Sequence, residues 1–104
     1  MTEWINVIAD VDLAEGAHAL AEVDGVEVAV FKSAGRCYAV ANVCSHDGGE
    51  IIGGAVENGE LICPRHGARF CLKTGAATAP PAYEPIESFA VRITDGLVQV
   101  RTAE

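Results

Sequence analysis

Apolar and polar residues alternate along several short stretches of the chain, as they do in strands that bury one face. In one stretch, Val26, Val28 and Val30 are interrupted by Glu27 and followed by Lys32. The alternation and the residues that interrupt it predict seven strands: Trp4–Ile8, Ala17–Val23, Val26–Lys32, Arg36–Ala41, Glu60–Cys63, Ser88–Thr94 and Leu97–Arg101.

Turn signals separate these strands. Asp24-Gly25, Asn58-Gly59 and Asp95-Gly96 favour type I′ turns, because both central residues of such a turn have positive φ. No window of a dozen residues keeps a helical period, and Asp10–Gly16 is expected to hold one short turn at most. Short strands joined by tight turns predict an all-β fold, an antiparallel β-sandwich or barrel.

The length and composition of the chain are those of a single domain, residues 1–104, with 50% apolar residues and without a repeat, low-complexity tract or linker. The first fifteen residues carry acidic side chains and no long apolar run, which argues against a secretory signal. No stretch has the apolar length of a membrane span. We therefore expect a soluble, cytoplasmic protein that does not bind membranes.

The charge is strongly acidic: 15 Asp and Glu against 7 Lys and Arg give a net charge of −8. Nucleic acids and anionic membranes repel such a surface, whereas basic protein surfaces attract it. The charge therefore favours protein partners over nucleic acid.

Two half-sites with one thiol and one imidazole each stand in the middle of the chain: Cys44 and His46, then Cys63 and His66. Zinc takes such a set on one tetrahedral ion, but zinc fingers of the familiar kind pair two thiols in one half-site and two imidazoles in the other. A Rieske-type [2Fe–2S] cluster takes two thiolates on one iron and two imidazoles on the second. Because each half-site here carries one ligand of each type, the order favours the two-iron cluster, with zinc as the alternative.

The residues around the half-sites, CSHDGG at 44–49 and CPRHGARF at 63–70, resemble the Rieske family, in particular the small Rieske ferredoxins that supply electrons to non-haem iron oxygenases. The resemblance extends over nearly the whole chain, to a proline-containing loop at Ala79–Ala82 that resembles the loop covering the cluster. It implies a Rieske iron-sulfur domain, in which a cluster-binding subdomain at about residues 42–75 is inserted into the β framework.

The resemblance also implies the role of each ligand. Cys44 and Cys63 are expected to bind the buried iron, and His46 and His66 the outer iron, where the imidazole edges offer a short path for electrons. Cys44 and His46 follow the strand that ends near Ala41, and Cys63 closes another strand, so the two loops can face each other across one cluster.

Departures from the Rieske proteins of respiratory and photosynthetic complexes indicate a low reduction potential. Those proteins join the two loops by a disulfide, but Gly49 and Arg65 stand at its positions here. They also direct two hydroxyl groups at the cluster, whereas this chain has Ala68 and Phe70. With fewer donors, a reduced cluster is less stabilised, as in the low-potential ferredoxins and oxygenase domains.

The remaining residues exclude a catalytic role. Only His18 is left for a mononuclear iron site, which needs two histidines and a carboxylate, and no G-x-G-x-x-G motif for a flavin or nicotinamide is present. We hypothesise a monomeric one-electron carrier between an NAD(P)H-dependent ferredoxin reductase, a flavoprotein, and a ring-hydroxylating terminal oxygenase. The alternatives are a small Rieske subunit of an enzyme such as assimilatory nitrite reductase, and a zinc-binding interaction module.

Three further residues are expected to lie outside the metal site. Cys37 and Cys71 are interpreted as free thiols, with Cys37 a small buried residue of its strand. His18, far from the half-sites in sequence, is expected at the surface or half-buried.

Overall fold

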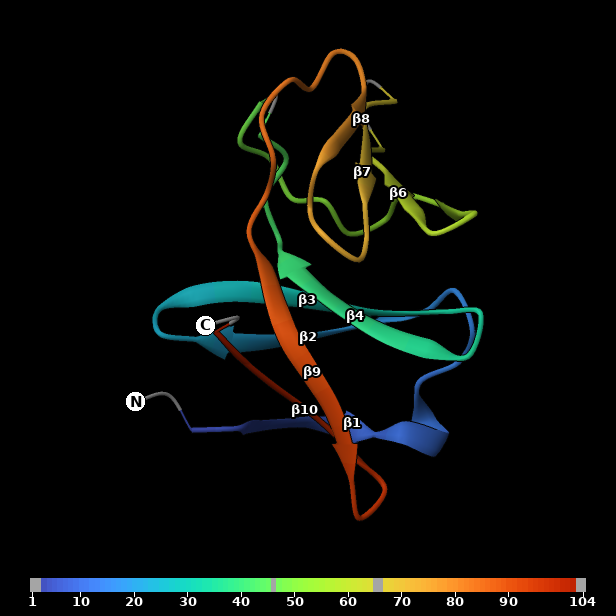
Figure 1. Cartoon of the computed structure of the whole chain (residues 1–104), viewed down its shortest axis with the longest axis vertical. Coiled ribbons are helices and arrows are strands. Elements are labelled where there is room, and N and C mark those ends of the chain that lie inside the picture. The colour runs from blue at the N-terminus through green and yellow to red at the C-terminus, as the bar shows by residue number, and fades with distance from the viewer. Residues whose placement is uncertain (1–2, 46, 65–66, 103–104) are drawn as a thin grey trace.

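Two antiparallel sheets contain the strands of the chain, as the computed structural model shows for residues 3–45, 47–64 and 67–102 (Figure 1). The larger sheet has six strands in the order β1-β10-β9-β4-β3-β2, and the smaller has four in the order β5-β6-β7-β8. The larger sheet contains β1 (Ile5–Ala9), β2 (His18–Val23), β3 (Val26–Ser33), β4 (Arg36–Ala41), β9 (Ser88–Thr94) and β10 (Leu97–Thr102). The smaller contains β5 (Val56–Glu57), β6 (Glu60–Ile62), β7 (Arg69–Cys71) and β8 (Ala77–Ala79).

The expected all-β framework is confirmed, and each of the seven expected strands begins and ends within one residue of its observed bounds. A single 3₁₀ turn, Asp10–Asp12, lies where one short turn was expected. The short strands β5, β7 and β8 were not predicted. No helix of the described residues is long and apolar enough to cross a membrane.

Type I′ geometry is confirmed at the three Asx-Gly turns, where both central residues have positive φ. A fourth turn of this kind, which the sequence did not reveal, joins β3 to β4 through Ala34 (φ 53°) and Gly35 (φ 78°). Alanine is unusual in a left-handed conformation. Here the Glu15 carboxylate accepts hydrogen bonds from the N–H groups of both turn residues, which stabilises the turn.

Strands β3 and β4 are covered on both faces. On one face Val28, Val30 and Ala39 belong to the core of the larger sheet. On the other face Phe31 and Val40 pack against residues of the smaller sheet and its loops. The inserted segment between β4 and β9 therefore sits on the outer face of the larger sheet, at one end of the molecule in Figure 1.

Cys37 is half-buried rather than fully buried as expected. It lies on β4, which pairs with β9 only at Ala39–Phe89 and Val40–Ser88, so the two strands separate before Cys37 is reached. The separation also leaves Ile93 48% exposed. His18 is exposed on β2, in agreement with the expectation.

Candidate metal centre

Two buried thiols meet at the junction of the larger and smaller sheets. Cys44 lies three residues after the end of β4, and Cys63 directly follows β6; their side chains are 0% and 1% exposed. Their sulfurs and a carboxylate oxygen of Asp47 all lie within 4.8 Å of one another. The structure thus brings together the two expected cysteine ligands. His46 and His66, the two expected imidazole ligands, lie outside the described residues.

The two cysteines begin backbone turns of identical design. In each loop the cysteine N–H donates to the carbonyl five residues later, and the cysteine carbonyl accepts from the N–H four residues later, where a glycine has a φ of 75° to 77°. The N···O distances are 2.8 Å for both bonds of the first loop (Cys44 to Gly49, Gly48 to Cys44), and 2.7 Å (Cys63 to Ala68) and 3.1 Å (Gly67 to Cys63) in the second.

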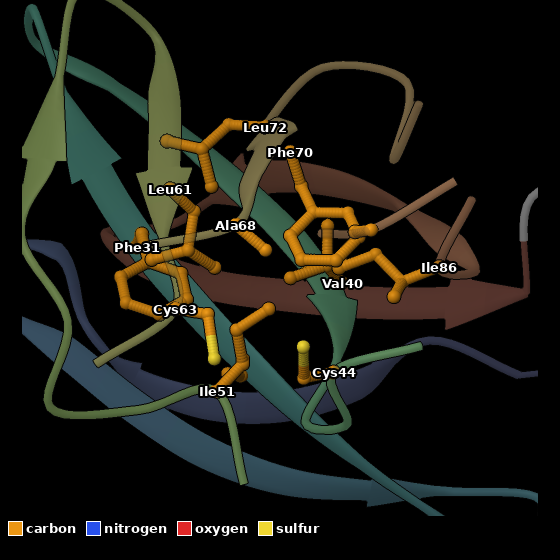
Figure 2. Close-up of a cluster of buried hydrophobic side chains, with 12 residues drawn as sticks. Phe31, Val40, Cys44, Ile51, Leu61, Cys63, Ala68, Phe70, Leu72 and Ile86 are labelled. Carbon is orange, nitrogen blue, oxygen red and sulfur yellow. The ribbon is translucent and has the colours of Figure 1, made fainter. Parts of the chain in front are cut away.

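Apart from the Asp47 carboxylate, the two thiols are surrounded by apolar side chains (Figure 2). The buried cluster that contains both thiols also includes Ile51, Leu61, Phe70, Leu72 and Ile86. Two thiolates on one tetrahedral ion with bonds of about 2.3 Å lie about 3.8 Å apart, and the sulfur positions are compatible with that separation. Because the described cysteines form no disulfide, both thiols are available to one metal ion.

A loop over the site is fixed at several points. Ser45 Oγ donates to the Glu84 carbonyl (2.6 Å), and the Ile86 N–H donates to the Gly75 carbonyl (2.9 Å). Ala82 and Ile86 are buried, whereas Tyr83 between them is 82% exposed. These residues continue directly from Ala79–Ala82, the segment expected to cover the site. Glu84 connects them to the first cysteine loop through its hydrogen bond with Ser45.

Comparison with known proteins settles the family. Residues 3–90 match the Rieske [2Fe-2S] domain. The chain belongs to the Rieske family. The expected [2Fe–2S] cofactor and the expected Rieske fold are thereby confirmed, and the family favours the iron–sulfur cluster over zinc.

Several relatives of this Rieske domain are ferredoxins. The ferredoxin component of the naphthalene 1,2-dioxygenase system of Pseudomonas putida is 33% identical over 98 residues, which are 94% of each chain. The ferredoxin of carbazole 1,9a-dioxygenase from Nocardioides aromaticivorans IC177 superposes with a TM-score of 0.91 at 30% identity, over 97% of this chain and 99% of that one. A ferredoxin chain in a complex of reduced oxygenase and oxidised ferredoxin in carbazole 1,9a-dioxygenase superposes with a TM-score of 0.88 at 27% identity, over 96% and 94%. By name, these relatives are electron carriers of dioxygenase systems.

The positions that lack hydroxyl groups are in the Rieske core. Ala68 and Phe70 are both fully buried, in the same apolar cluster as the two thiols. Neither side chain can donate a hydrogen bond to a sulfur. The two positions at which the sequence predicts no hydroxyl donor therefore belong to the apolar cluster around the two thiols.

Asp47 was not singled out from the sequence. Its Oδ1 accepts a hydrogen bond from the Gly49 N–H (2.9 Å) within the first loop. In the sequence, Asp47 stands three residues after Cys44, as His66 stands three residues after Cys63. Aligning the half-sites on their cysteines and glycines, rather than on their histidines, would have revealed this equivalence.

A third loop has the same turn. The Cys71 N–H donates to the Ala76 carbonyl (2.8 Å), and the Gly75 N–H donates to the Cys71 carbonyl (2.7 Å). The pKa of the Cys71 thiol is lowered, chiefly by a hydrogen bond from the Thr74 side chain and also by the N–H groups of Thr74 and Lys73, while desolvation opposes the change. The spacing Cys-x₃-Gly, present three times in the sequence, is the signal that could have predicted all three turns.

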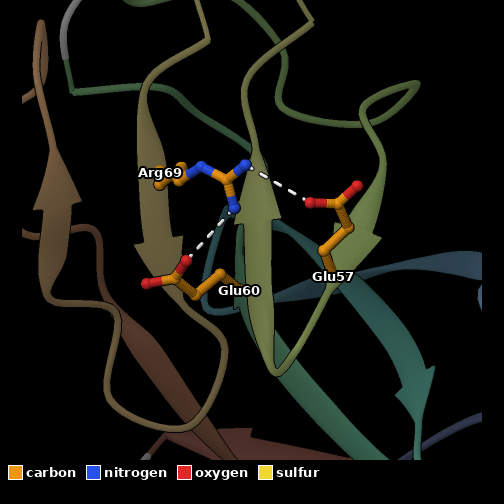
Figure 3. Close-up of polar contacts among 3 residues, drawn as sticks. All are labelled: Glu57, Glu60 and Arg69. Atoms are coloured by element: carbon orange, nitrogen blue, oxygen red, sulfur yellow. Dashed lines mark hydrogen bonds and ion pairs between the residues drawn. The ribbon is translucent and has the colours of Figure 1, made fainter.

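The hairpin that carries the second loop is held by a charged group as well as by its strands. Arg69 on β7 contacts Glu60 on the adjacent strand β6 (3.2 Å) and Glu57 on β5, one strand further (3.3 Å) (Figure 3). All three side chains are partly exposed, so each ion pair contributes little to stability.

Proposed function

We propose that this chain is the ferredoxin of a multicomponent oxygenase system. It carries one electron at a time from an NAD(P)H-dependent ferredoxin reductase, a flavoprotein, to a non-haem iron, ring-hydroxylating terminal oxygenase. The observation that carries the proposal is the buried thiol pair in a Rieske fold that named ferredoxin components match over nearly their whole length. The match to a ferredoxin in complex with its oxygenase supports the choice of partner.

The proposed ligands are Cys44, His46, Cys63 and His66, within a single Rieske domain of residues 1–104 whose cluster-binding part is about residues 42–75. A [2Fe–2S] cluster supplies a centre that takes up and releases one electron. The two cysteines, which are buried, would bind one iron and exclude water from it, and the two histidines would bind the other iron. The chain has no further role in the oxygenation, because electron transfer needs no group that contacts the substrate.

The proposed partner surface lies over the tips of the cysteine loops. Val43 and Tyr83 are among the few exposed large apolar side chains of the described residues. Val43 precedes Cys44, and Tyr83 precedes Glu84, whose carbonyl accepts a hydrogen bond from Ser45. Asp47 and Glu84, in the same two segments, are exposed as well. An aromatic side chain with an acidic surround suits a partner surface that offers an apolar pocket with a basic rim. We propose that the carrier acts as a monomer in the cytoplasm, and that it binds neither nucleic acid nor membrane.

Reconstitution of electron transfer tests the proposal. The purified chain is mixed anaerobically with NADH and the reductase of a naphthalene dioxygenase system, and then with the matching terminal oxygenase and oxygen. We expect uptake of one electron per chain, and formation of dihydroxylated product only when the chain is present. A chain that stays oxidised, or that passes no electrons to the oxygenase, contradicts the proposal. Stoichiometric association with a sirohaem nitrite reductase would instead support the alternative of a small enzyme subunit.

A further inference from the structure

Asn42 is the one buried polar side chain among the described residues, at 8% exposure. Its amide makes four hydrogen bonds. Nδ2 donates to Glu27 Oε1 (2.7 Å) and Glu50 Oε2 (3.3 Å), and Oδ1 accepts from the N–H groups of Ile51 (2.9 Å) and Ile52 (3.2 Å). Two donors and two acceptor sites are all that a side-chain amide has, so every one is used.

The amide closes the first cysteine loop. The second loop is closed by a strand ladder, because β6 and β7 pair up to Ile62–Arg69, next to Cys63. Within the described residues no strand follows the first loop before β5, and both edges of β4 are already occupied, by β3 and β9, so the segment after the loop forms no ladder with β4. The two hydrogen bonds from Ile51 and Ile52 to Asn42 Oδ1 take the place of the missing ladder.

Ile51 links this closure to the thiols. Its side chain is fully buried and belongs to the same apolar cluster as Cys44 and Cys63. Figure 2 shows it close to both cysteines. The hydrogen bond to Asn42 therefore fixes the backbone of a residue that forms the apolar wall beside both proposed ligands.

We propose that Asn42 is a positioning residue of the metal centre, whose side-chain amide holds Ile51 and Ile52 against the thiols and thereby sets the reduction potential of the bound cluster. The apolar shell around a metal site controls water access and so its potential. Water near the sulfurs stabilises the more negative reduced state, which raises the midpoint. The proposal rests on the proposed cofactor but not on the proposed partners.

The first variant removes the amide. In Asn42→Ala we expect a raised midpoint in protein-film voltammetry, changed g-values in the EPR spectrum of the reduced protein, and at least tenfold faster hydrogen exchange in the peptide containing Ile51 and Ile52. Asn6→Ala is the matched control, because Asn6 is an exposed residue of β1 that accepts one hydrogen bond from Gln99. That variant should change none of the three readouts.

The second experiment reverses one hydrogen bond without changing net charge. Asn42→Asp keeps an acceptor for Ile51 and Ile52 but places a carboxylate against Glu27 and Glu50, so it should loosen the loop by repulsion. Adding Glu27→Gln supplies an amide that donates to the new carboxylate at the shorter of the two contacts, and the double variant carries the same net charge as the wild type. Because the longer contact with Glu50 remains, we expect the double variant to move the exchange rate and the midpoint back towards the wild-type values.

Two results would overturn the proposal. One is an Asn42→Ala protein that melts at a lower temperature while its midpoint and EPR spectrum remain those of the wild type, as for a residue that contributes only to stability. The other applies even if Asn42→Ala does not fold: a double variant that recovers neither the exchange rate nor the midpoint relative to Asn42→Asp. Both readouts are obtained without a reductase or oxygenase, so they are independent of the partner assignment.

Discussion

The two cysteine loops have the same backbone turn, but different parts of the molecule hold them closed. The second loop, which begins at Cys63, is the tip of a hairpin, and the ladder between β6 and β7 supports it. The first, which begins at Cys44, follows a single strand, and the Asn42 side chain supplies the closing hydrogen bonds. A ladder distributes its support over several backbone bonds, and substitutions other than proline leave these bonds in place. Beyond the two backbone bonds of its own turn, the first loop depends on the Asn42 side chain, so a single substitution can remove its closing hydrogen bonds.

The Cys71 loop extends the comparison, since it has the same turn but, among the described residues, Cys71 belongs to no group of three potential metal ligands such as that of Cys44, Asp47 and Cys63. The turn alone therefore does not make a metal site. Cys44 and Cys63 become a pair because β4 and β6 carry their loops to the same apolar cluster.

The largest expected effect comes from removing a ligand. Cys44→Ala, Cys63→Ala, His46→Ala or His66→Ala should lose the cluster or most of it, because each variant removes one of the four expected ligands. Cys71→Ser should keep two irons and two labile sulfides per chain. Iron and sulfide analysis with the EPR spectrum of the reduced protein measures both. If Cys71→Ser lost the cluster while Cys63→Ser kept it, the assignment of the second loop would be wrong.

Substitution of the turn glycine should destabilise the protein more in the third loop than in the first. A Cβ on Gly75 would lie 2.0 Å from the Ile86 carbonyl oxygen, and φ there is +81°. Gly75→Ala must therefore shift backbone, and we expect a loss of stability of about 3 kcal/mol. Gly48→Ala has open space around its Cβ and should cost only the left-handed conformation, about 1 kcal/mol. Thermal unfolding followed by visible circular dichroism compares them; equal losses would contradict the close contact at Gly75.

The pH dependence of thiol alkylation distinguishes the two cysteines outside the site. Hydrogen bonds from Thr74 lower the pKa of Cys71, and burial raises the pKa of Cys37. Cys71 should therefore react with iodoacetamide at lower pH than Cys37, as peptide mass spectrometry can measure. Because the pKa of Cys71 is lower in the folded chain, its contribution to stability is present at high pH and is lost as the pH falls through that pKa.

Removal of the Thr74 hydroxyl tests whether its hydrogen bond is the main cause of the lowered pKa of Cys71. Thr74→Val should shift the alkylation profile of Cys71 to higher pH, and Thr74→Ser should leave it near that of the wild type. An unchanged profile in Thr74→Val would exclude the hydroxyl as the main cause.

The smallest effect is expected at the Arg69 contacts. Arg69→Met removes two partly exposed ion pairs and should lower the free energy of unfolding by about 1 kcal/mol or less, while the β6–β7 ladder keeps the second loop closed. The loss should shrink in high salt, because salt screens exposed charges. A loss of cluster in this variant would show that the hairpin depends on side chains as much as the first loop does.

Strand positions followed from the sequence because alternation and Asx-Gly turns are local signals. Strands β5 and β8 are too short to show a period. The turn at Ala34-Gly35 depends on Glu15, nineteen residues away in sequence. The proposed cysteine ligands could be picked out from their spacing. The proposed role of Asn42 could not, because it arises from contacts with β3 and with the segment after the loop.

The midpoint potential of the wild-type protein is the most direct test of the claim that this chain is a low-potential Rieske electron carrier. Ala68 and Phe70 are buried with the thiols and offer no hydroxyl, and a net charge of −8 disfavours an added electron. Protein-film voltammetry should give a midpoint near the lower end of the family range, about −150 mV, with little change around pH 7. Ala68→Ser and Phe70→Tyr should each raise it if the new hydroxyl reaches a sulfur. A wild-type midpoint above about +100 mV would contradict the account, and it would also argue against an NAD(P)H-dependent reductase as the electron donor.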